Sequence, residues 1–292
     1  MQHAILITAY KNRKQLEGLI DTFSPNFRCY IHIDKKSSLS DNDLEILSKK
    51  PNVDFVCRHY KINWGGVNHL LAIIMLLQEA IKNPANQYFH LITGQDFPIK
   101  PVMDIDRFFE ENNGREFMEV FKMPYEKWWY GGYDRIDQYV FADAFNRKST
   151  FGKAVIRTSV LIQRKLGFKR KYYEGFPELY GGSTYWSVSR DCAHYITQYI
   201  DNNPRYLKRF KYTFCTEEIF FQTIVMNSPF GKNVTNNPLR YIVWEVRNGN
   251  FPANLDEQDE EAIRQSDAIF ARKFESPVSD GLLSNIKKRI KQ

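Results

Sequence analysis

The first hundred residues alternate short apolar runs with longer amphipathic segments, and this alternation constrains the fold more than any other feature. The clearest helix is VNHLLAIIMLLQEAIKN (67–83), because its apolar side chains recur at helical spacing. Strands that alternate with helices predict βαβ units, and therefore an α/β fold with a mainly parallel sheet flanked by helices. We expect strands at 4–10, 29–34, 53–58 and 88–93 and helices at 13–23, 41–50 and 67–83.

Beyond residue 110 the alternation stops. GGSTYWSVSR (181–190) has the pattern of a strand, and helices are expected at 189–203 and at 216–230, the last one opening on two glutamates. The sequence contains no repeat, low-complexity tract or linker that would divide it. A chain of 292 residues with 43% hydrophobic residues can bury one large core, so we expect a single domain over residues 1–292.

The cysteines and the apolar segments indicate the compartment. The four cysteines lie far apart without CxxC or Cys/His ligand spacing, so we expect reduced thiols and no zinc site. The N-terminal MQHAILITAY lacks a cleavage motif, and no stretch approaches the roughly 18 apolar residues of a spanning helix. These patterns predict a cytoplasmic protein.

The net charge of +7 admits nucleic acid, an anionic membrane surface or a phosphorylated small molecule as partner. Basic residues gather at 164–173, 205–212 and 285–292, and the first two segments are equally well explained as solvated helix faces. The last segment, NIKKRIKQ, has the pattern of a short basic amphipathic tail, which suits peripheral contact with the inner face of an anionic membrane. We expect no nucleic acid partner, because no RNA-binding or helix-turn-helix signature is present.

Polar residues follow three of the four expected strands. Tyr10 ends the first strand, Asp34 and Lys35 follow the second, and Gln95 and Asp96 follow the fourth. In open α/β sheets ligands bind beyond the carboxyl ends of the strands, so these residues are expected to meet at one site. The aspartate at position 34 would accept hydrogen bonds from a ribose or a base, and the lysine would face phosphate. A charged loop without a ligand is the alternative.

Trp64, Gly65 and Gly66 stand directly before the helix at 67–83. Paired glycines permit close approach of the backbone, and the start of a helix offers free N–H groups to an anion. A plain turn accounts for this motif equally well.

In combination these motifs resemble a known family. YIHIDKKSS, NWGGVNHLLA, LITGQDFPIK, GGSTYWSVSR, TEEIFFQT, YIVW and IFARKF follow the order found in the Core-2/I-branching β-1,6-N-acetylglucosaminyltransferases and xylosyltransferases, glycosyltransferase family 14, in a bacterial-type form. The resemblance covers about residues 4 to 275 and is weakest between 120 and 175. It implies a GT-A-type fold, a UDP-sugar donor and inversion of the anomeric configuration. It also implies that residues 1–110 bind the nucleotide sugar, that 111–275 bind the acceptor and carry catalysis, and that 276–292 form a basic tail.

An inverting transfer is a single displacement that needs a base to remove the proton of the acceptor hydroxyl. Glu218 in TEEIFFQT matches the second acid of the family's acidic pair, which acts as the catalytic base. The first acid is Glu217, where the family has aspartate, and this departure leaves open which of the two points into the site. The alternative is that both glutamates only stabilise a helix N-terminus, by a few tenths to about 1 kcal/mol.

The departing UDP gains charge that needs a cation nearby, and many GT-A enzymes hold a divalent metal with an Asp-x-Asp motif. The chain has two such triplets, 41–43 and 104–106, and both stand where helices are expected to begin, with Asp41 as N-cap. At the position of the metal motif, Gly94-Gln95-Asp96 offers a single carboxylate, which is a poor site for a divalent cation. We therefore expect no metal cofactor.

The family replaces the metal with basic side chains on the diphosphate. Lys273 in IFARKF matches one of these residues, Arg272 lies beside it, and Arg247 in WEVRNGN is a nearby candidate for the partner arginine. A solvent-facing helix residue is the alternative for Lys273. The complete set of expected donor residues is Tyr10, Asp34, Lys35, Trp64, Gly65, Gly66, Gln95, Asp96, Arg247, Arg272 and Lys273.

The acceptor residues follow from the same resemblance. Trp244 in YIVW matches a tryptophan near the acceptor sugar, and an indole face packs well against a pyranose. The expected acceptor residues are Glu119, Lys127, Arg135, Ser183, Trp186, Glu217 and Trp244.

Together these expectations describe a metal-independent, inverting glycosyltransferase that moves GlcNAc from UDP-GlcNAc to a hydroxyl of a glycan or lipid-linked oligosaccharide. A β-1,6 branch in cell-surface polysaccharide assembly is the expected product. A metal-dependent transferase using UDP-xylose, UDP-galactose or UDP-glucose is one alternative, and a non-catalytic carbohydrate-binding protein is the other.

Overall fold

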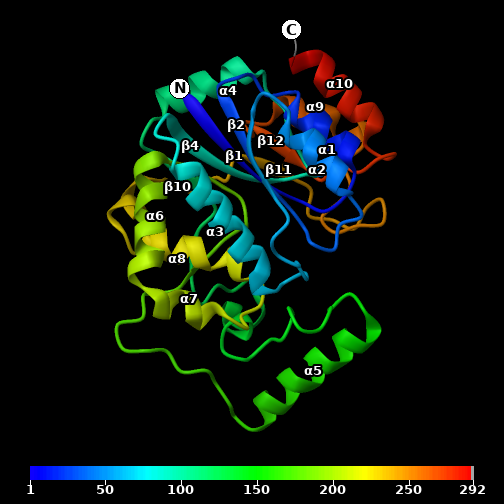
Figure 1. Cartoon of the computed structure of the whole chain (residues 1–292). Helices are drawn as coiled ribbons and strands as arrows, with labels where there is room; N and C mark the ends of the chain where they lie inside the picture. The colour runs from blue at the N-terminus through cyan, green and yellow to red at the C-terminus, as the bar shows by residue number, and fades with distance from the viewer. Residues whose placement is uncertain (291–292) are drawn as a thin grey trace.

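The computed structural model describes residues 1–290, and its centre is a sheet (Figure 1). Within these residues seven strands lie in the order β10-β6-β9-β4-β1-β2-β3. Their bounds are β1 Gln2–Ala9, β2 Phe27–Ile33, β3 Val53–Cys57, β4 Asn86–Thr93, β6 Glu116–Met118, β9 Trp186–Ser189 and β10 Val234–Thr235. Strands β3, β2, β1 and β4 run parallel, as do β10 and β6, and β9 is antiparallel to both of its neighbours. The expected α/β fold with a mainly parallel sheet flanked by helices is confirmed.

Helices cover both faces of this sheet (Figure 1). One face carries α1 (Arg13–Ile20), α2 (Asp41–Ser48), α4 (Val102–Glu111), α9 (Glu260–Gln265) and α10 (Asp280–Ile290). The opposite face carries α3 (Val67–Ile81), α6 (Arg190–Asn202), α7 (Pro204–Phe210) and α8 (Phe220–Met226). Helix α5 (Thr150–Lys165) projects away from these layers.

The alternation of side chains along β1 builds a hydrophobic core on each face. Ile5 and Ile7 belong to the core under α1 and α10, whereas Ala4 and Leu6 belong to the core under α3 and α6. Successive residues of a strand point to opposite faces, so a strand that is apolar at every position is buried on both sides. The apolar runs of the first hundred residues are explained by this arrangement.

The expected elements of the first hundred residues are all present, with small shifts at their ends. One correction concerns α2, whose N-cap is Ser40 rather than Asp41: the Ser40 side chain accepts from the Asp43 backbone N–H in a capping box. Both Asp-x-Asp triplets lie in the first turns of helices, α2 and α4. The helix expected at 216–230 is instead a 3-10 turn, Thr216–Glu218, followed by α8.

A second, three-stranded sheet begins in the turn after β4. Strand β5 (Asp96–Pro98) runs antiparallel to β12 (Phe270–Arg272), which pairs in parallel with β11 (Arg240–Ile242). Asp96 stands opposite Arg272 in this ladder. A short ladder of β7 (Phe121–Lys122) and β8 (Tyr180–Gly181) completes the strands of the described chain. The small sheet ties the C-terminal third of the chain to the end of β4.

The expected basic tail, 276–292, contains α10, and its last two residues lie outside the described residues. The apolar side of α10 packs into the core through Leu282, Leu283, Ile286 and Ile290. This apolar side therefore does not face a membrane. Across residues 1–290 no helix is both long enough and apolar enough to cross a bilayer. All four cysteines, each within the described residues, are free thiols.

Candidate active site

The carboxyl ends of β1 and β4 and the segment after β12 meet at one place. The Tyr10 hydroxyl donates to Gln95 Oε1 at 3.4 Å, and the Gln95 amide donates to Glu275. Lys11 Nζ donates to both carboxylate oxygens of Glu275 at 2.7 Å. Two expected donor residues, Tyr10 and Gln95, thus bond each other directly, and Glu275, an acid that the sequence did not indicate, joins Gln95 to Lys11.

Lys273 directly follows β12 and is partly buried beside this group. Within residues 1–290 its amine has no hydrogen bond or ion pair to a protein side chain. Burial lowers the pKa of Lys273 to about 8, and the neighbouring charges of Arg272, Lys11 and Lys148 contribute in the same direction. Across the described chain Glu275 is the one acid whose charge acts on Lys273, and it is already paired with Lys11. A half-buried ammonium that forms no ion pair and has more cations than acids around it is electrostatically suited to an anion. We call Lys11, Lys148 and Lys273 the lysine cluster.

Arg272 and Asp96 form a buried pair behind the lysine cluster. Arg272 Nε lies 3.4 Å from Asp96 Oδ1, and the guanidinium lies 4.3 Å from the centre of the Tyr185 ring. Asp96 is only 2% exposed and its second oxygen accepts from the Thr93 N–H at 2.6 Å. The expectation that Asp96 contacts a donor is not supported, because its side chain is 1% exposed. Arg272 keeps 12% side-chain exposure, and its contact with a donor stays a prediction. The two side chains fix β5 against β12, and so position Lys273 through the backbone.

Arg247 is also corrected. Its guanidinium donates to both oxygens of Asp259 at 2.7 Å and to Asp256 at 3.2 Å, and it lies 3.1 Å from Glu245. Its charge is balanced by three acids. The structure assigns Arg247 to the packing of the segment before α9 and gives it no contact with the lysine cluster.

The two residues after β2 have different surroundings. Asp34 is buried, and its Oδ1 accepts the backbone N–H groups of Lys36 at 2.9 Å and Ile62 at 3.1 Å. Its carboxylate therefore joins the loop after β2 to the loop before α3. Lys35 is exposed at the same edge of the sheet.

Backbone N–H groups at the start of α3 are bound by a side chain of the protein. The Asp143 carboxylate accepts from Val67 N at 2.8 Å and from Asn68 N at 3.2 Å. A Cβ on Gly66 would lie 2.3 Å from the same carboxylate, so the glycine is required for this contact. Two of the N–H groups expected here to be free for an anion, those of Val67 and Asn68, are thus bound by Asp143, which acts as a cap.

Gly65 and Trp64 do not cap α3, and they lie next to the segment that carries the two glutamates. Gly65 has a positive φ of 77°, and its carbonyl accepts from the Cys215 N–H at 3.1 Å. Trp64 is exposed and meets the Phe214 ring edge-on at 5.1 Å. These contacts place Trp64 next to the segment that carries the two glutamates.

The acidic pair lies in the 3-10 turn before α8, and its two members differ. Glu217 is buried and receives a 3.0 Å hydrogen bond from His69 Nδ1. Burial raises the pKa of Glu217, yet the nearby charge and hydrogen bond of His69 outweigh it, and the net pKa lies below its usual range. Glu218 retains 27% side-chain exposure and forms an ion pair with Arg135. Of the two acids, Glu218 is the one that solvent reaches.

Burial raises the pKa of Glu218 to about 6. The Arg135 charge lowers this pKa, and the carboxylates of Glu217 and Glu119 raise it. The Arg135 guanidinium in turn lies 3.7 Å from the centre of the Trp128 ring. A carboxyl group with a pKa near 6 is ionised at neutral pH yet remains basic enough to accept a proton, as a general base requires.

Glu119 and Ser183 lie beside this pair. The Gly182 N–H donates to the Glu218 carbonyl at 2.9 Å, and a Cβ on Gly182 would lie 1.8 Å from the Glu119 carbonyl oxygen. Ser183 is buried and its carbonyl accepts from the Gln222 amide at 2.7 Å. The structure therefore gathers Glu119, Arg135 and Ser183 around Glu218, and their role in acceptor binding stays a prediction.

Two bridges join the lysine cluster to the acidic pair. Thr8, near the end of β1, lies 3.3 Å from His69 Nε2, and His69 binds Glu217 on its other side. Tyr185 lies under Arg272 and belongs to the segment that carries Ser183. His69 thus links the end of β1 to Glu217, and Tyr185 links Arg272 to the segment of Ser183.

Three expected acceptor residues are not part of this group. Trp186 is 0% exposed and packs against Phe221 at 5.3 Å, so its assignment is corrected to the core. Trp244 is exposed beside Phe251, and Lys127 is exposed, each without a contact to Glu218 among the described residues.

Sequence reasoning missed Lys11, His69 and Lys148. Lys11 directly follows Tyr10 at the carboxyl end of β1, so the argument that selected Tyr10 also indicated the lysine. His69 is a polar residue in an otherwise apolar helix, which is a weaker signal. Lys148 lies in the basic region 145–175, where position along the chain gave no indication of proximity to Lys273.

No group of three or more His, Cys, Asp and Glu side chains is arranged to hold a metal ion anywhere in residues 1–290.

Comparisons with known proteins identify relatives. The family model described as Core-2/I-Branching enzyme matches residues 4–265. Xylosyltransferase sqv-6 of Caenorhabditis briggsae is 23% identical over 255 residues, covering 84% of this chain and 29% of that protein. Xylosyltransferase oxt of Drosophila melanogaster is 24% identical over 282 residues, covering 89% of this chain and 30% of that protein. The chain thus spans less than a third of the length of these relatives.

Among solved structures, S. aureus TarS 1–349 in complex with UDP-GlcNAc matches with a TM-score of 0.30 and 16% identity, over 42% of this chain and 34% of that chain. The same protein in complex with UDP matches with a TM-score of 0.32 and 14% identity.

Proposed function

The chain belongs to the Core-2/I-branching enzyme family, and from this premise we propose that it is an inverting glycosyltransferase that moves a sugar from a UDP-sugar to a hydroxyl of a glycan. Two observations support the proposal: a solvent-reachable carboxylate with a raised pKa, Glu218, and a half-buried lysine that forms no ion pair within the described chain, Lys273. These are the two groups that a displacement without a metal requires.

Glu218 would act as the general base. Its carboxylate takes the proton of the acceptor hydroxyl while the hydroxyl oxygen forms a bond to the anomeric carbon. The bond from that carbon to the diphosphate oxygen breaks on the opposite face, and UDP leaves with the electron pair. Arg135 would hold the Glu218 carboxylate in place, supported by its ion pair and its stacking on Trp128. Glu217, held by His69, would support the turn and not contact the hydroxyl.

The lysine cluster would bind the diphosphate. The charge that develops on the leaving oxygen is stabilised by ammonium groups that are fixed before the reaction, which avoids reorganisation in the transition state. Lys11 is held by Glu275, and Lys273 is held by the small sheet through Arg272 and Asp96. Fixed cations of this kind would take the place of a divalent metal.

The donor sugar has two candidates. The branching members of the family suggest UDP-GlcNAc and a β-1,6 bond, while the relatives named above are xylosyltransferases and favour UDP-xylose. The acceptor we propose is a glycan or a lipid-linked oligosaccharide.

UDP release tests the proposal directly. Purified protein is supplied with UDP-GlcNAc or UDP-xylose and a mixture of glycan acceptors in excess EDTA. We expect UDP release that falls at least about a hundredfold in Glu218→Gln, the scale of a general-base contribution. Wild-type activity in Glu218→Gln would assign the base elsewhere, and activity that disappears in EDTA would support a metal-dependent transferase. Sugar binding without UDP release from any donor would support a carbohydrate-binding protein.

A further inference from the structure

Helix α5 has little contact with the rest of the protein. In Figure 1 it stands apart from the layered body and is joined to it by two long connections. Of residues 150–165, all described, only Gly152 and Ile156 are buried. Ile156 packs on Val140 and Ala142 in a small cluster that is separate from the two main cores. A single edge of the helix is therefore attached to the body.

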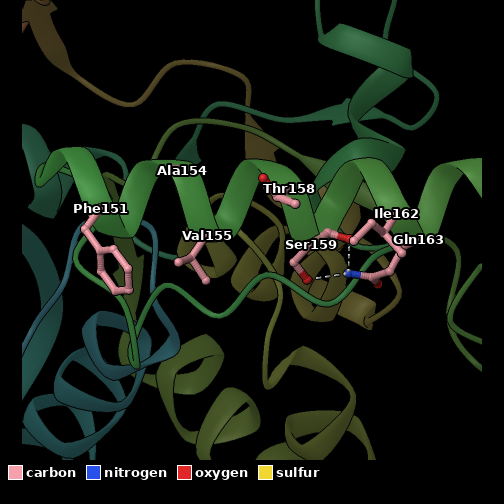
Figure 2. A pocket seen from close by; sticks show the side chains of 7 residues that line it. All are labelled: Phe151, Ala154, Val155, Thr158, Ser159, Ile162 and Gln163. Carbon is pink, nitrogen blue, oxygen red and sulfur yellow. Dashed lines mark hydrogen bonds between the residues drawn. The ribbon is translucent and has the colours of Figure 1, made fainter.

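A second edge of α5 is apolar and open. Phe151 is 72% exposed, Ile162 52% and Leu166 77%. Residues 151, 155, 158, 162 and 166 recur every three or four positions, so they share one face of the helix. Figure 2 shows a hollow along the helix, and the residues that line it all belong to α5. The body reaches this face near its two ends, where the Phe145 ring lies 6.3 Å from Phe151 and Gln163 bonds the Tyr139 backbone, while Ile162 stays 52% exposed.

The region around α5 is entirely basic in its ionisable side chains. Between residues 144 and 173 the chain has no aspartate or glutamate. The basic residues there are Arg147, Lys148, Lys153, Arg157, Arg164, Lys165, Lys169, Arg170 and Lys171. Within residues 1–290 none of them forms an ion pair. The helix thus combines an open apolar face with a high and uncompensated positive charge.

We propose that α5 docks the protein on an anionic lipid bilayer. The open apolar face would enter the boundary between headgroups and acyl chains, and the flanking basic side chains would contact lipid phosphates, as interfacial amphipathic helices do. Arg157 and Lys165 are exposed and long enough to reach the headgroups while Phe151 and Ile162 are inserted.

Charge complementarity favours a bilayer over other occupants. A second copy of the chain would bring two uncompensated basic helices together, and their repulsion opposes dimer formation. A nucleic acid offers phosphates but no apolar phase for Phe151, Ile162 and Leu166. An anionic bilayer offers both.

Docking through α5 has a consequence for the site, which rests on the proposed function. The Arg147 guanidinium lies 4.2 Å from the centre of the Phe214 ring and 5.3 Å from that of Trp64. Near the other end of the helix, the Arg164 guanidinium lies 5.1 Å from the Tyr130 ring. Both ends of α5 therefore contact segments that border the candidate active site. A docked helix would hold that site near the bilayer surface, where a lipid-linked acceptor resides.

Vesicle co-sedimentation tests the docking independently of catalysis. The full chain is mixed with vesicles of phosphatidylcholine alone, or with about one third phosphatidylglycerol, at about 0.1 M salt where exposed charges are screened beyond ~10 Å. We expect binding to the anionic vesicles only. The double variant Phe151→Ser/Ile162→Ser and the double variant Arg157→Glu/Lys165→Glu should each bind at least about tenfold more weakly, because both the apolar area and the charge contribute.

The controls separate this proposal from the others. Met103→Ser removes an equally exposed apolar side chain, 78% exposed on α4, and should bind vesicles as the wild type does. Glu218→Gln should also bind normally, so a failure of the proposed catalysis leaves this test intact. Unchanged thermal melting of each variant confirms that it is folded.

Four results would overturn the proposal. They are absence of binding to anionic vesicles, wild-type binding by Phe151→Ser/Ile162→Ser, an equal loss in Met103→Ser, or a concentration-dependent dimer that Phe151→Ser/Ile162→Ser abolishes.

Discussion

The ion pair between Arg135 and Glu218 gives a prediction that depends on the geometry of the site. Burial raises the pKa of Glu218 to about 6, and the Arg135 charge keeps it from rising further. Replacement of Arg135 by Gln removes that charge and leaves a side chain that still donates hydrogen bonds. An opposite charge at contact distance lowers a carboxyl pKa by ~1–3 units, so the variant should have a Glu218 pKa of roughly 7 to 9.

The general base acts only when ionised, so its protonation sets the acidic limb of the rate profile. In the wild type kcat/KM should rise with pH and reach half of its maximum near pH 6. With a variant pKa of about 7.5, the ionised fraction at pH 6.5 falls from roughly three quarters to about one tenth. The expected defect is thus about eightfold at pH 6.5 and shrinks as the pH rises.

Initial rates of UDP release between pH 5 and pH 9, at donor and acceptor concentrations below KM, measure this limb. Arg164→Gln is the matched control, because Arg164 also stacks on an aromatic ring in this region but has no contact with Glu218. A shift of the acidic limb in Arg135→Gln alone supports the assignment. A uniform loss of activity at every pH, or an unshifted limb, would refute the claim that Arg135 sets the ionisation of the base.

The lysine cluster and the α3 cap give further predictions. Since burial lowers the pKa of Lys273 to about 8, kcat/KM should fall above that pH as the ammonium loses its charge. Lys273→Arg should keep its activity to higher pH, because the guanidinium stays charged. If the fall in kcat/KM above pH 8 persists in Lys273→Arg, another group causes it. Removal of divalent metals with EDTA should leave the rate of UDP release unchanged. Asp143→Ala should lower the free energy of unfolding in urea by about 1–2 kcal/mol through loss of the cap. Gly66→Ala should lower the free energy of unfolding by about 1–3 kcal/mol, because its Cβ would overpack against the Asp143 carboxylate. The double variant Asp143→Ala/Gly66→Ala should lose less stability than the sum of the two single variants. Additive losses would contradict the contact between Gly66 and Asp143.

The first half of the fold follows from the sequence because local pattern and tertiary environment agree there. Strands β1 and β4 each carry an apolar run and are buried at nearly every position, and α3 carries its apolar residues at helical spacing. Short strands gave a weaker signal. Strand β5 has three residues and exists because β12, far along the chain, pairs with it. No local pattern predicts a partner that distant.

In the candidate site, too, some residues could be predicted from local sequence and others depend on distant parts of the chain. Motif order located Glu218 and Lys273, and the strand-end argument located Tyr10 and Gln95. The sequence did not show that Arg247 is balanced by three acids, because the partners are fixed by the loop that precedes α9. Trp186 has an indole ring that could stack on a sugar, and only its burial shows that it belongs to the core. Chemistry-bearing residue types are visible in a sequence, whereas their exposure and partners depend on packing.

The central claim is that fixed lysines, and no bound ion, carry the charge of the departing diphosphate. Calorimetric titration of the protein with UDP in EDTA tests it most directly, with Lys273→Ala and with UMP as comparisons. The account predicts that UDP binds without metal, that Lys273→Ala weakens UDP binding about tenfold or more by loss of a charge-assisted contact, and that UMP binding changes far less. UDP binding that requires a divalent cation, or that is equal in Lys273→Ala, would contradict it.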